Sequence, residues 1–484
     1  MPGCRLAALA LVAVFAGPPP LLADSVPRTA VLQRVDARAA RYGDLSRRLW
    51  ELAEPGFQET KSAALLVAEL RAAGFRVRER VADIPTAFVA EWGTGRPVVG
   101  IMGEYDALPG LSQEVASSKR PLASADYGHG CAHNLLGAGS ALAAVAVKET
   151  LEQARLPGTI RFYGTPAEEG GDGKVYMARA GVFDDVDVVL HWHPGDRNVA
   201  PAGSTLAIMG ARFRFTGQAA HAASAPDRGR SALDGLMLMA HAVDMLREHI
   251  PTDARLHYVV TNGGAAPNIV PSAAEMYLYA RHPQMEVLDG IWKRVVACAE
   301  AGALGTGTEM QMELVGSSYE VLPNDALTRL LDRNLREVGG VAYSPDDLAF
   351  AEALRQTVPV EAALPLGSQT AVRPSDEPFT IGSTDAGDIS WLAPTGWIFT
   401  ATNVPGIPLH SWQATACAGH GIGRKGMVVA AKTLALTAID LLTTPAEVQA
   451  ARAAFDERRA GRTYRSRIPP DMKPPLDYRR RADR

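Results

Sequence analysis

Three short apolar runs, each followed at once by a cluster of polar residues, constrain the fold more than any other feature of this sequence. The runs cover residues 97–102, 159–163 and 186–192. A long apolar stretch with helical spacing, residues 135–151, lies between the first two. Apolar runs of this length are typical of strands buried on both faces of a sheet. Strands that alternate with helices indicate an α/β sheet covered by helices on both sides.

The pattern changes between residues 207 and 318. Here the periodicity predicts strands and helices in the order β-α-β-β-α-β, at residues 207–216, 231–249, 256–261, 274–280, 287–302 and 309–315. This order is typical of a ferredoxin-like α+β unit. Helix–strand alternation then returns and ends with a long helix at 425–442. We therefore expect two domains: an α/β domain formed by residues 24–206 and 319–450, and a smaller α+β domain, 207–318, inserted into it.

The first 23 residues have the character of an export signal. Arg5 precedes an apolar run at 6–16, prolines end that run, and Ala23 precedes a polar residue. This is the pattern of a cleaved secretory signal, with Ala16 as a second possible cleavage site. We expect a periplasmic or secreted protein without an integral membrane span after removal of the signal. Three cysteines would remain, so disulfides are not what holds the fold together.

Charge gives no reason to expect a nucleic-acid partner. The chain has 49 basic and 53 acidic residues, a net charge of −4, and basic proteins are the ones that bind nucleic acids through their overall field. Residues 451–484 form a tail rich in Arg and Pro without apolar periodicity. We predict a solvated, partly disordered extension from residue 458 onward, with a polyanion-binding arm as the weaker alternative.

The polar clusters after the predicted strands contain donors suited to a metal ion. Cys131 and His133 stand two apart in a glycine-rich turn, and a thiolate with an imidazole is a typical ligand set for Zn²⁺. Two adjacent glutamates, 168 and 169, follow the second strand, so one can bind metal while the other acts as a general base. One histidine of the pair 191 and 193, which share a strand face, and His410 complete the set.

Five protein ligands exceed what one tetrahedral ion can use while keeping a water. Two ions that share a bridging group can use them, polarise a carbonyl and generate hydroxide. Asp106, directly after the first strand, is placed to accept the second N–H of a metal-bound histidine. Other catalytic motifs are missing: the sequence has no G-x-S-x-G, no phosphate-binding loop and no H-E-x-x-H.

The motifs together resemble the M20 metallopeptidase/amidohydrolase family, and most closely its aminobenzoyl-glutamate hydrolase branch. The resemblance runs from about residue 40 to 445. The segments that carry it, in chain order, are E-Y-D-A-L-P-G, G-H-G-C-A-H-N-L-L-G, G-T-P-A-E-E-G-G, H-W-H-P, G-Q-A-A-H-A-A, S-T-D-A-G-D-I-S-W and H-S-W-Q.

The resemblance implies a metal-bearing catalytic domain with an inserted domain that serves as lid and for dimerisation, and hence a homodimer. It implies two divalent ions, zinc being chemically favoured over manganese or cobalt. It selects His193 over its neighbour two residues before and makes Glu168 the general base. The implied metal ligands are Cys131, His133, Glu169, His193 and His410.

Three residues of the inserted domain are candidates for substrate binding. By the resemblance, His221 reaches the partner subunit's active site and polarises the substrate carbonyl, and Asn268 contacts substrate. Arg281 closes a predicted strand and could clamp a substrate carboxylate through its planar guanidinium. One departure from the family is Ala132, where relatives commonly have Gly; the added methyl matters only if the backbone there needs a positive φ.

We therefore expect a metal-dependent hydrolase that cleaves the amide of N-acyl or aminobenzoyl amino acids. A dipeptidase acting on a free amino terminus is the alternative within enzymes. An exported metal- or peptide-binding protein without catalysis is the alternative of another class. The intact pair Glu168–Glu169 argues against it, because a protein that only binds needs no base beside its ligands.

Overall fold

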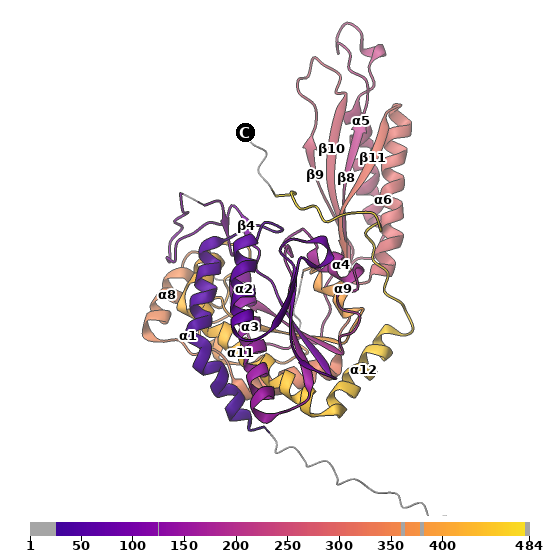
Figure 1. Cartoon of the computed structure of the whole chain (residues 1–484). Coiled ribbons are helices and arrows are strands. Elements are labelled where there is room, and N and C mark those ends of the chain that lie inside the picture. Colours follow the sequence, from indigo (N-terminus) through magenta and orange to yellow (C-terminus); the bar gives the residue numbers. More distant parts are fainter. Residues whose placement is uncertain (1–25, 124, 360–363, 378–381, 480–484) are drawn as a thin grey trace, which may run out of the picture.

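The computed structural model describes residues 26–123, 125–359, 364–377 and 382–479. The predicted export signal lies outside these ranges. The chain forms a rounded body from which a long second domain projects (Figure 1). The projecting domain interrupts the body in the sequence, because the chain leaves the body after β7 and returns to it after β11.

A six-stranded mixed sheet forms the centre of the body, in the order β1-β2-β6-β3-β7-β12. The four strands β6, β3, β7 and β12 run parallel, and β1 and β2 are antiparallel to their neighbours. The strands are Arg76–Glu79 (β1), Phe88–Thr94 (β2), Val98–Gly103 (β3), Gly158–Gly164 (β6), Val188–Gly195 (β7) and Thr395–Ala401 (β12), with a short pair Leu108–Pro109 (β4) and Tyr127–Gly128 (β5) beside them.

Helices cover both faces of this sheet, as its apolar strands require. On β3, Val99 and Ile101 pack with the helices of one face, whereas Val98 and Met102 pack with those of the other, because successive side chains of a strand point to opposite faces. The first face carries Arg28–Leu52 (α1), Thr60–Ala72 (α2), His133–Ala154 (α3), Asp325–Val338 (α7) and Gly421–Thr443 (α11); the second carries Gly173–Arg179 (α4) and Ala386–Ser390 (α9). The remaining helices of the body are Pro345–Arg355 (α8), Trp412–Gly419 (α10) and Pro445–Arg459 (α12).

The long helix α11 is a core helix. Within the described ranges it alone is long and apolar enough to cross a membrane, yet 78% of its most apolar window is buried inside the body. It packs there beside α3 and α1 (Figure 1). An all-round apolar helix is expected at such a fully buried position.

The projecting domain has the element order that the sequence predicts. Its elements are Ala207–Thr216 (β8), Ala232–Leu246 (α5), Arg255–Asn262 (β9), Ala273–His282 (β10), Met285–Thr306 (α6) and Glu309–Ser318 (β11). The four strands form an antiparallel sheet in the order β11-β8-β10-β9, and alternate residues of β10 are buried against α5 and α6. This is the inserted ferredoxin-like α+β domain, and β9 lies at the open edge of its sheet.

The prediction of a solvated C-terminal extension is wrong for the described residues that follow α12. Residues 461–479, here called the C-terminal strap, leave α12 and cross the body toward the space beside the projecting domain (Figure 1). Ile468 is only 2% exposed and packs in the core on the side of α4 and α9. Tyr464 and Tyr478 also pack there. The residues that make these apolar contacts are single and irregularly spaced in the sequence. They therefore form no helix or strand periodicity from which their burial could be predicted.

Candidate metal centre

The predicted metal-binding residues gather at the carboxyl ends of the parallel strands. Asp106 follows β3, Glu168 and Glu169 follow β6, and His193 lies near the end of β7. Parallel strands place these ends at one edge of the sheet, where open α/β sheets bind their ligands. His133 is the first residue of α3, and His410 lies on the loop before α10.

Five candidate ligands from four separate segments come together at this edge. The Sγ of Cys131 lies 3.4 Å from Nε2 of His193, and Nε2 of His410 lies 3.3 Å from Oε1 of Glu169. Donor atoms fall within 4.8 Å of one another in three groups: Cys131, His133 and His193; Cys131, Glu169 and His410; and Glu104, His133 and Glu168. Cys131 belongs to two groups and His133 to two, so the groups form one continuous cluster.

The chemistry of this cluster fits bound cations. Nε2 of His133 and Oε1 of Glu169 are buried, and the polar atoms nearest to them belong to other ionisable groups of the site, Glu104 at 3.2 Å and His410 at 3.3 Å. Buried polar and charged atoms crowded together in this way are costly unless something binds them. Although burial opposes it, the imidazoles of His193 and His133 lower the pKa of the Cys131 thiol well below its usual range. A thiolate, imidazoles and a carboxylate are ligands that Zn²⁺ and similar ions prefer.

Negatively charged neighbours raise the pKa of two histidines of the cluster, so a cation competes with protons for these imidazoles. Hydrogen bonds to Cys131 and Glu169 raise the pKa of His410 to about 11. Burial lowers the pKa of His193, but the charge of Cys131 outweighs it and the net shift is upward. A cation that binds here would replace these protons, since a histidine must be neutral to act as a ligand.

Two positions in the cluster have a strained backbone. Ala132, the N-cap of α3 between Cys131 and His133, has φ +58°, and His410 has φ +57°. Non-glycine residues with such angles are uncommon, and they cluster at functional sites. The backbone therefore does need a positive φ at Ala132, and alanine adopts it here.

Asp106 holds two parts of the cluster. Its Oδ1 lies 2.9 Å from Nδ1 of His133, and its Oδ2 accepts a 2.9 Å hydrogen bond from the backbone N–H of Glu169. Burial alone would raise the pKa of Asp106, but the charge of His133 and the hydrogen bonds from His133 and Glu169 outweigh it and lower this pKa, so the carboxylate is ionised. An ionised carboxylate only accepts, so Nδ1 of His133 donates and Nε2 faces the cluster. This is the arrangement expected of a carboxylate that orients a metal-binding histidine.

Behind the cluster lies a buried ion network that the sequence analysis missed. The Nζ of Lys174 on α4 is 2.6 Å from Oε1 of Glu104 and 2.6 Å from Oδ1 of Asp385, and all three side chains are fully buried. The other oxygen of Glu104 lies 3.2 Å from Nε2 of His133. A lysine buried with two carboxylates is stable only because it is paired. Two members of the network lie in motifs named above, Glu104 in E-Y-D-A-L-P-G and Asp385 in S-T-D-A-G-D-I-S-W.

The structure separates the two histidines of the H-W-H-P motif. Nε2 of His193 faces Cys131, whereas Nε2 of His191 lies 3.4 Å from Oε1 of Glu104 in the buried ion network. Burial lowers the pKa of His191 to about 3, so its imidazole is neutral. Of the two, His193 is therefore the one beside the other donors.

Glu168 stands next to the donors with a perturbed acidity. Its carboxylate belongs to the group with Glu104 and His133. Burial, and then the charges of Glu104 and Glu169, raise the pKa of Glu168 well above its usual range. A carboxyl group whose pKa is raised binds a proton more readily, which suits it to accept one and return it.

The inserted-domain residues lie differently from one another. Arg281, at the end of β10, donates from one guanidinium nitrogen to Oγ of Ser383 in the body, at 3.2 Å, and its buried Nε has no partner among the described residues. His221 and Asn268 are exposed and belong to two neighbouring loops that bridge between His221 and Ile269. The hydrogen bonds of the His221 ring stay within its own loop, to the N–H groups of Ala223 and Ser224. Within a single chain, Arg281 therefore contacts the body, whereas the contacts given for His221 and Asn268 stay within the inserted domain.

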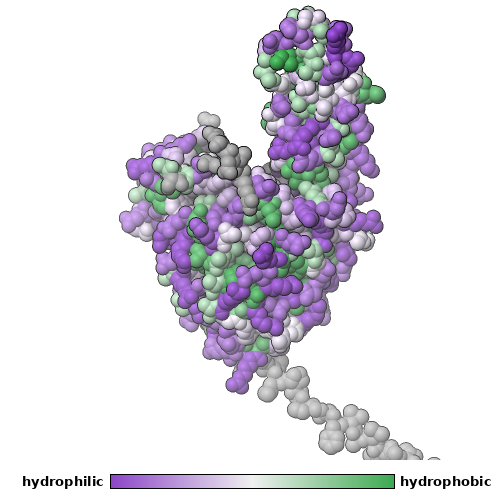
Figure 2. All heavy atoms as spheres, turned by 45° about the horizontal axis from the view of Figure 1, so that its top comes forward, coloured by the Kyte–Doolittle hydropathy of each residue, from purple (hydrophilic) through white to green (hydrophobic). Residues whose placement is uncertain are grey.

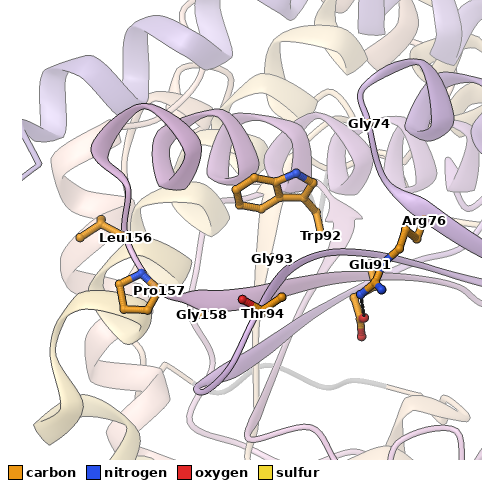
Figure 3. Close-up of a pocket in the computed structure, with 9 residues that line it drawn as sticks. All are labelled: Gly74, Arg76, Glu91, Trp92, Gly93, Thr94, Leu156, Pro157 and Gly158. Atoms are coloured by element: carbon orange, nitrogen blue, oxygen red, sulfur yellow. Dashed lines mark hydrogen bonds and ion pairs between the residues drawn. The ribbon is translucent and has the colours of Figure 1, made fainter.

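A surface pocket of about 460 Å³ lies elsewhere (Figure 3). It is lined by Arg76, Glu91 and Trp92 together with the residues 156–158 that lead into β6. The glutamate pair follows the opposite end of β6, and seven strand residues span about 20 Å. This pocket is therefore separate from the metal cluster.

Comparison with known proteins agrees with this geometry. The model of peptidase family M20/M25/M40 matches residues 100–410. The chain is 37% identical to a p-aminobenzoyl-glutamate hydrolase subunit of Escherichia coli K12, over 91% of this chain and 97% of the relative. It is 31% identical to the human Xaa-Arg dipeptidase, over 87% of this chain and 90% of the relative.

Among solved structures, the fold is similar to that of a dinuclear metal binding peptidase from the M20 family of Bacillus subtilis. The TM-score is 0.58 at 18% identity, and the match covers 84% of this chain and 99% of the other. The two-domain α/β architecture is therefore that of the family. The chain belongs to peptidase family M20/M25/M40 and is a metal-dependent amidohydrolase or peptidase.

Proposed function

We propose that this enzyme hydrolyses the amide bond of N-acyl or aminobenzoyl amino acids with two divalent ions in the cluster at the sheet edge. The observation that carries the proposal is the convergence of five donor side chains with Glu168 beside them. A binding protein would need the donors but not a second glutamate whose pKa is raised.

The proposed ligands are the five residues that the sequence singled out, namely Cys131, His133, Glu169, His193 and His410. Two bound ions would polarise the substrate carbonyl and acidify a water. Zinc is proposed because thiolate and imidazole favour it over manganese or cobalt. The Bacillus subtilis peptidase of similar fold is likewise described as dinuclear.

Glu168 is proposed as the general base. It accepts the proton of the attacking water and later passes it to the leaving nitrogen. Burial and the neighbouring charges of Glu104 and Glu169 raise its pKa and so make it a better proton acceptor. Arg281 is proposed to bind a substrate carboxylate. Its guanidinium sits at the junction between the two domains with one buried nitrogen still without a partner among the described residues.

A homodimer is proposed to complete the site. His221 and Asn268 project on exposed loops of the inserted domain, so they would serve the active site of a partner subunit. Apolar side chains are exposed at several places among the polar ones on the surface of this domain (Figure 2). On its edge strand, Val259 is 58% and Val260 46% exposed, and Met245 on α5 is 70% exposed. An unpaired strand edge with exposed apolar residues is a typical interface.

The substrate proposal follows the Escherichia coli relative, which this chain matches over most of its length. That protein is named for p-aminobenzoyl-glutamate, whose amide joins an aromatic acyl group to an amino acid with two carboxylates. The dipeptidase alternative is favoured by the human Xaa-Arg dipeptidase, which this chain matches almost as completely. Export to the periplasm or the medium remains a proposal that rests on residues 1–23.

A substrate panel tests the proposal. The mature protein is stripped of metal, reconstituted with Zn²⁺, Mn²⁺ or Co²⁺, and assayed on aminobenzoyl-glutamate, acetylated amino acids and the corresponding free dipeptides. Hydrolysis of the acylated compounds that depends on added metal supports the proposal. Cleavage of the free dipeptides alone makes the enzyme a dipeptidase. Failure of every compound contradicts both.

A further inference from the structure

The C-terminal strap joins two distant parts of the molecule. Near its start, the hydroxyl of Tyr464 donates to Asp388 at 2.6 Å, and Arg467 pairs with Asp289 of α6 in the inserted domain at 2.5 Å. Tyr319, at the end of the inserted domain, donates to the backbone carbonyl of Arg465 at 3.0 Å. The strap is thus anchored at the junction of the two domains before it turns toward the sheet edge.

The middle of the strap is held mainly through its backbone carbonyls. The guanidinium of Arg179 on α4 donates to the carbonyls of Pro469 and Met472, and Gln58 donates to the carbonyl of Leu476. Four prolines lie within residues 469–475. Proline has no N–H to satisfy and restricts the unfolded chain, so a proline-rich segment held through its carbonyls is ordered at a reduced entropic cost.

The strap ends against the loop that carries Glu168 and Glu169. The hydroxyl of Tyr478 lies 3.3 Å from the backbone carbonyl of Glu169, and the guanidinium of Arg479 donates to the same carbonyl. Arg479 also donates to the carbonyl of Ala107 at 3.2 Å. The strap is fixed there in turn, because Tyr127 donates to the carbonyl of Arg479 at 3.1 Å. The ring of Tyr478 packs edge-on against Phe57.

Both backbone groups of Glu169 are consequently held from outside its own loop. The N–H is held by Asp106 and the carbonyl by the strap. The loop needs such support because two glycines, Gly170 and Gly171, follow directly, and Gly170 has φ +99°. Glycines leave a loop free to adopt other conformations. A rotation of the peptide after Glu169 would move the carboxylate that faces His410.

We propose that Tyr478 and Arg479 are positioning residues of the metal centre: by holding the Glu169 carbonyl they fix the Glu169 carboxylate as a ligand and the neighbouring Glu168 as the base. The inference rests on the proposed roles of these two glutamates. Neither strap residue contacts a reacting atom in this assignment. The C-terminal end of the chain is therefore part of the architecture of the site.

The test compares three strap variants with a matched control. Arg479→Ala removes both guanidinium contacts, Arg479→Lys keeps the charge but not the forked geometry, and Tyr478→Phe removes one hydroxyl and keeps the ring. Arg458→Ala is the control, because the side chain of this exposed arginine pairs only with Asp325 on the surface among the described residues. Zn²⁺ affinity is measured by competition with a chelator, unfolding is measured on the metal-free proteins, and kcat and KM are measured separately.

We expect Zn²⁺ affinity to fall by about tenfold or more in Arg479→Ala, less in Arg479→Lys and Tyr478→Phe, and not in the control, as for other residues that support metal ligands. The metal-free melting temperature should stay unchanged and kcat should fall more than KM changes. Wild-type Zn²⁺ affinity in all three strap variants overturns the inference, as does a loss of metal-free stability with affinity retained. Because affinity is measured without substrate, the result stands even if the proposed amide hydrolysis fails.

Discussion

Asp106 fixes the orientation of His133, with Oδ1 of the carboxylate 2.9 Å from Nδ1 of the imidazole, while Oδ2 holds the backbone of Glu169. One buried side chain thus aligns two proposed ligands from different segments. Asp106→Asn replaces one carboxylate oxygen by an NH₂ group. This NH₂ group must then face either the Nδ1–H of His133 or the backbone N–H of Glu169, and neither can accept a hydrogen bond from it. We expect metal affinity or activity to fall by about 10- to 100-fold. Chelator competition with Zn²⁺ measures it, and Asp185→Asn, an exposed partner of Arg161, is the control. Unchanged affinity would show that Asp106 does not support the ligands.

Glu168→Gln separates binding from catalysis. The amide keeps the size of the side chain but cannot take a proton from water, so kcat should fall by about 10²- to 10⁴-fold. Metal content, measured on the purified variant by atomic absorption, should stay at the wild-type level because Glu169 is left in place. Glu377→Gln, a surface partner of Arg373, serves as the control. A variant with full turnover would refute the assignment of Glu168 as the base.

Because Ala132 has a positive φ, we expect substitutions at this position to differ clearly in their effect on stability. Ala132→Gly removes a backbone cost of roughly 1–2 kcal/mol but loses a buried methyl and gains unfolded-state entropy, so stability should change by less than about 1 kcal/mol. Ala132→Val places a β-branched side chain in the left-handed region and should destabilise by about 2 kcal/mol or more. Urea unfolding of both variants measures the difference. Equal stability of the two would mean that the backbone at this position is not constrained.

Stability should depend on pH through Asp388. Burial raises the pKa of this carboxyl to about 8, although the Tyr464 hydroxyl and the Tyr319 N–H bond to it. Since the folded pKa exceeds the unfolded one near 4, the favourable contribution is complete below about pH 4 and is lost as the pH rises to about 8. Asp388→Asn is neutral throughout. The melting temperature of the variant minus that of the wild type should therefore increase as the pH rises from about 4 to about 8. A difference that stays constant over this range would contradict the assignment.

Removal of metal should lower the melting temperature. Free metal at about 100 times its dissociation constant adds about 2.7 kcal/mol to the free energy of unfolding, if it binds only the folded chain. We expect thermal scans with and without Zn²⁺ to differ by several degrees. Cys131→Ser should abolish most of the difference, because a hydroxyl is a poor ligand for zinc. Cys298→Ser, at a half-buried cysteine of α6, should retain it. Equal shifts in both variants would place the metal elsewhere.

The strands and the donor set could be predicted because their signals are local. Apolar runs defined the central strands, and polar clusters directly after them gave the sheet edge where Cys131, His133 and Glu169 meet. The boundaries were less accurate. β7 extends to Gly195, beyond the predicted end at residue 192, because histidine and proline interrupt the apolar run while the backbone continues to pair with β12.

The buried ion network and the strap could not be predicted because their partners are remote. Lys174 looks like an ordinary surface lysine until Glu104 and Asp385, 70 and 211 residues away in the sequence, are placed beside it. Likewise, Arg479 and Glu169 are 310 residues apart. No period or motif relates such positions, and an Arg- and Pro-rich composition favours disorder in the absence of these contacts.

The interruption of the body by the projecting domain has a consequence for biosynthesis. His193 is made before that domain and His410 long after it, so a nascent chain cannot assemble the full donor set until almost all of its residues have left the ribosome. Contacts between such distant segments form late in folding. A truncated or stalled product would therefore expose thiol and imidazole groups without a complete metal centre. Metal would bind fully only to chains in which the parts of the body before and after the inserted domain have already packed together.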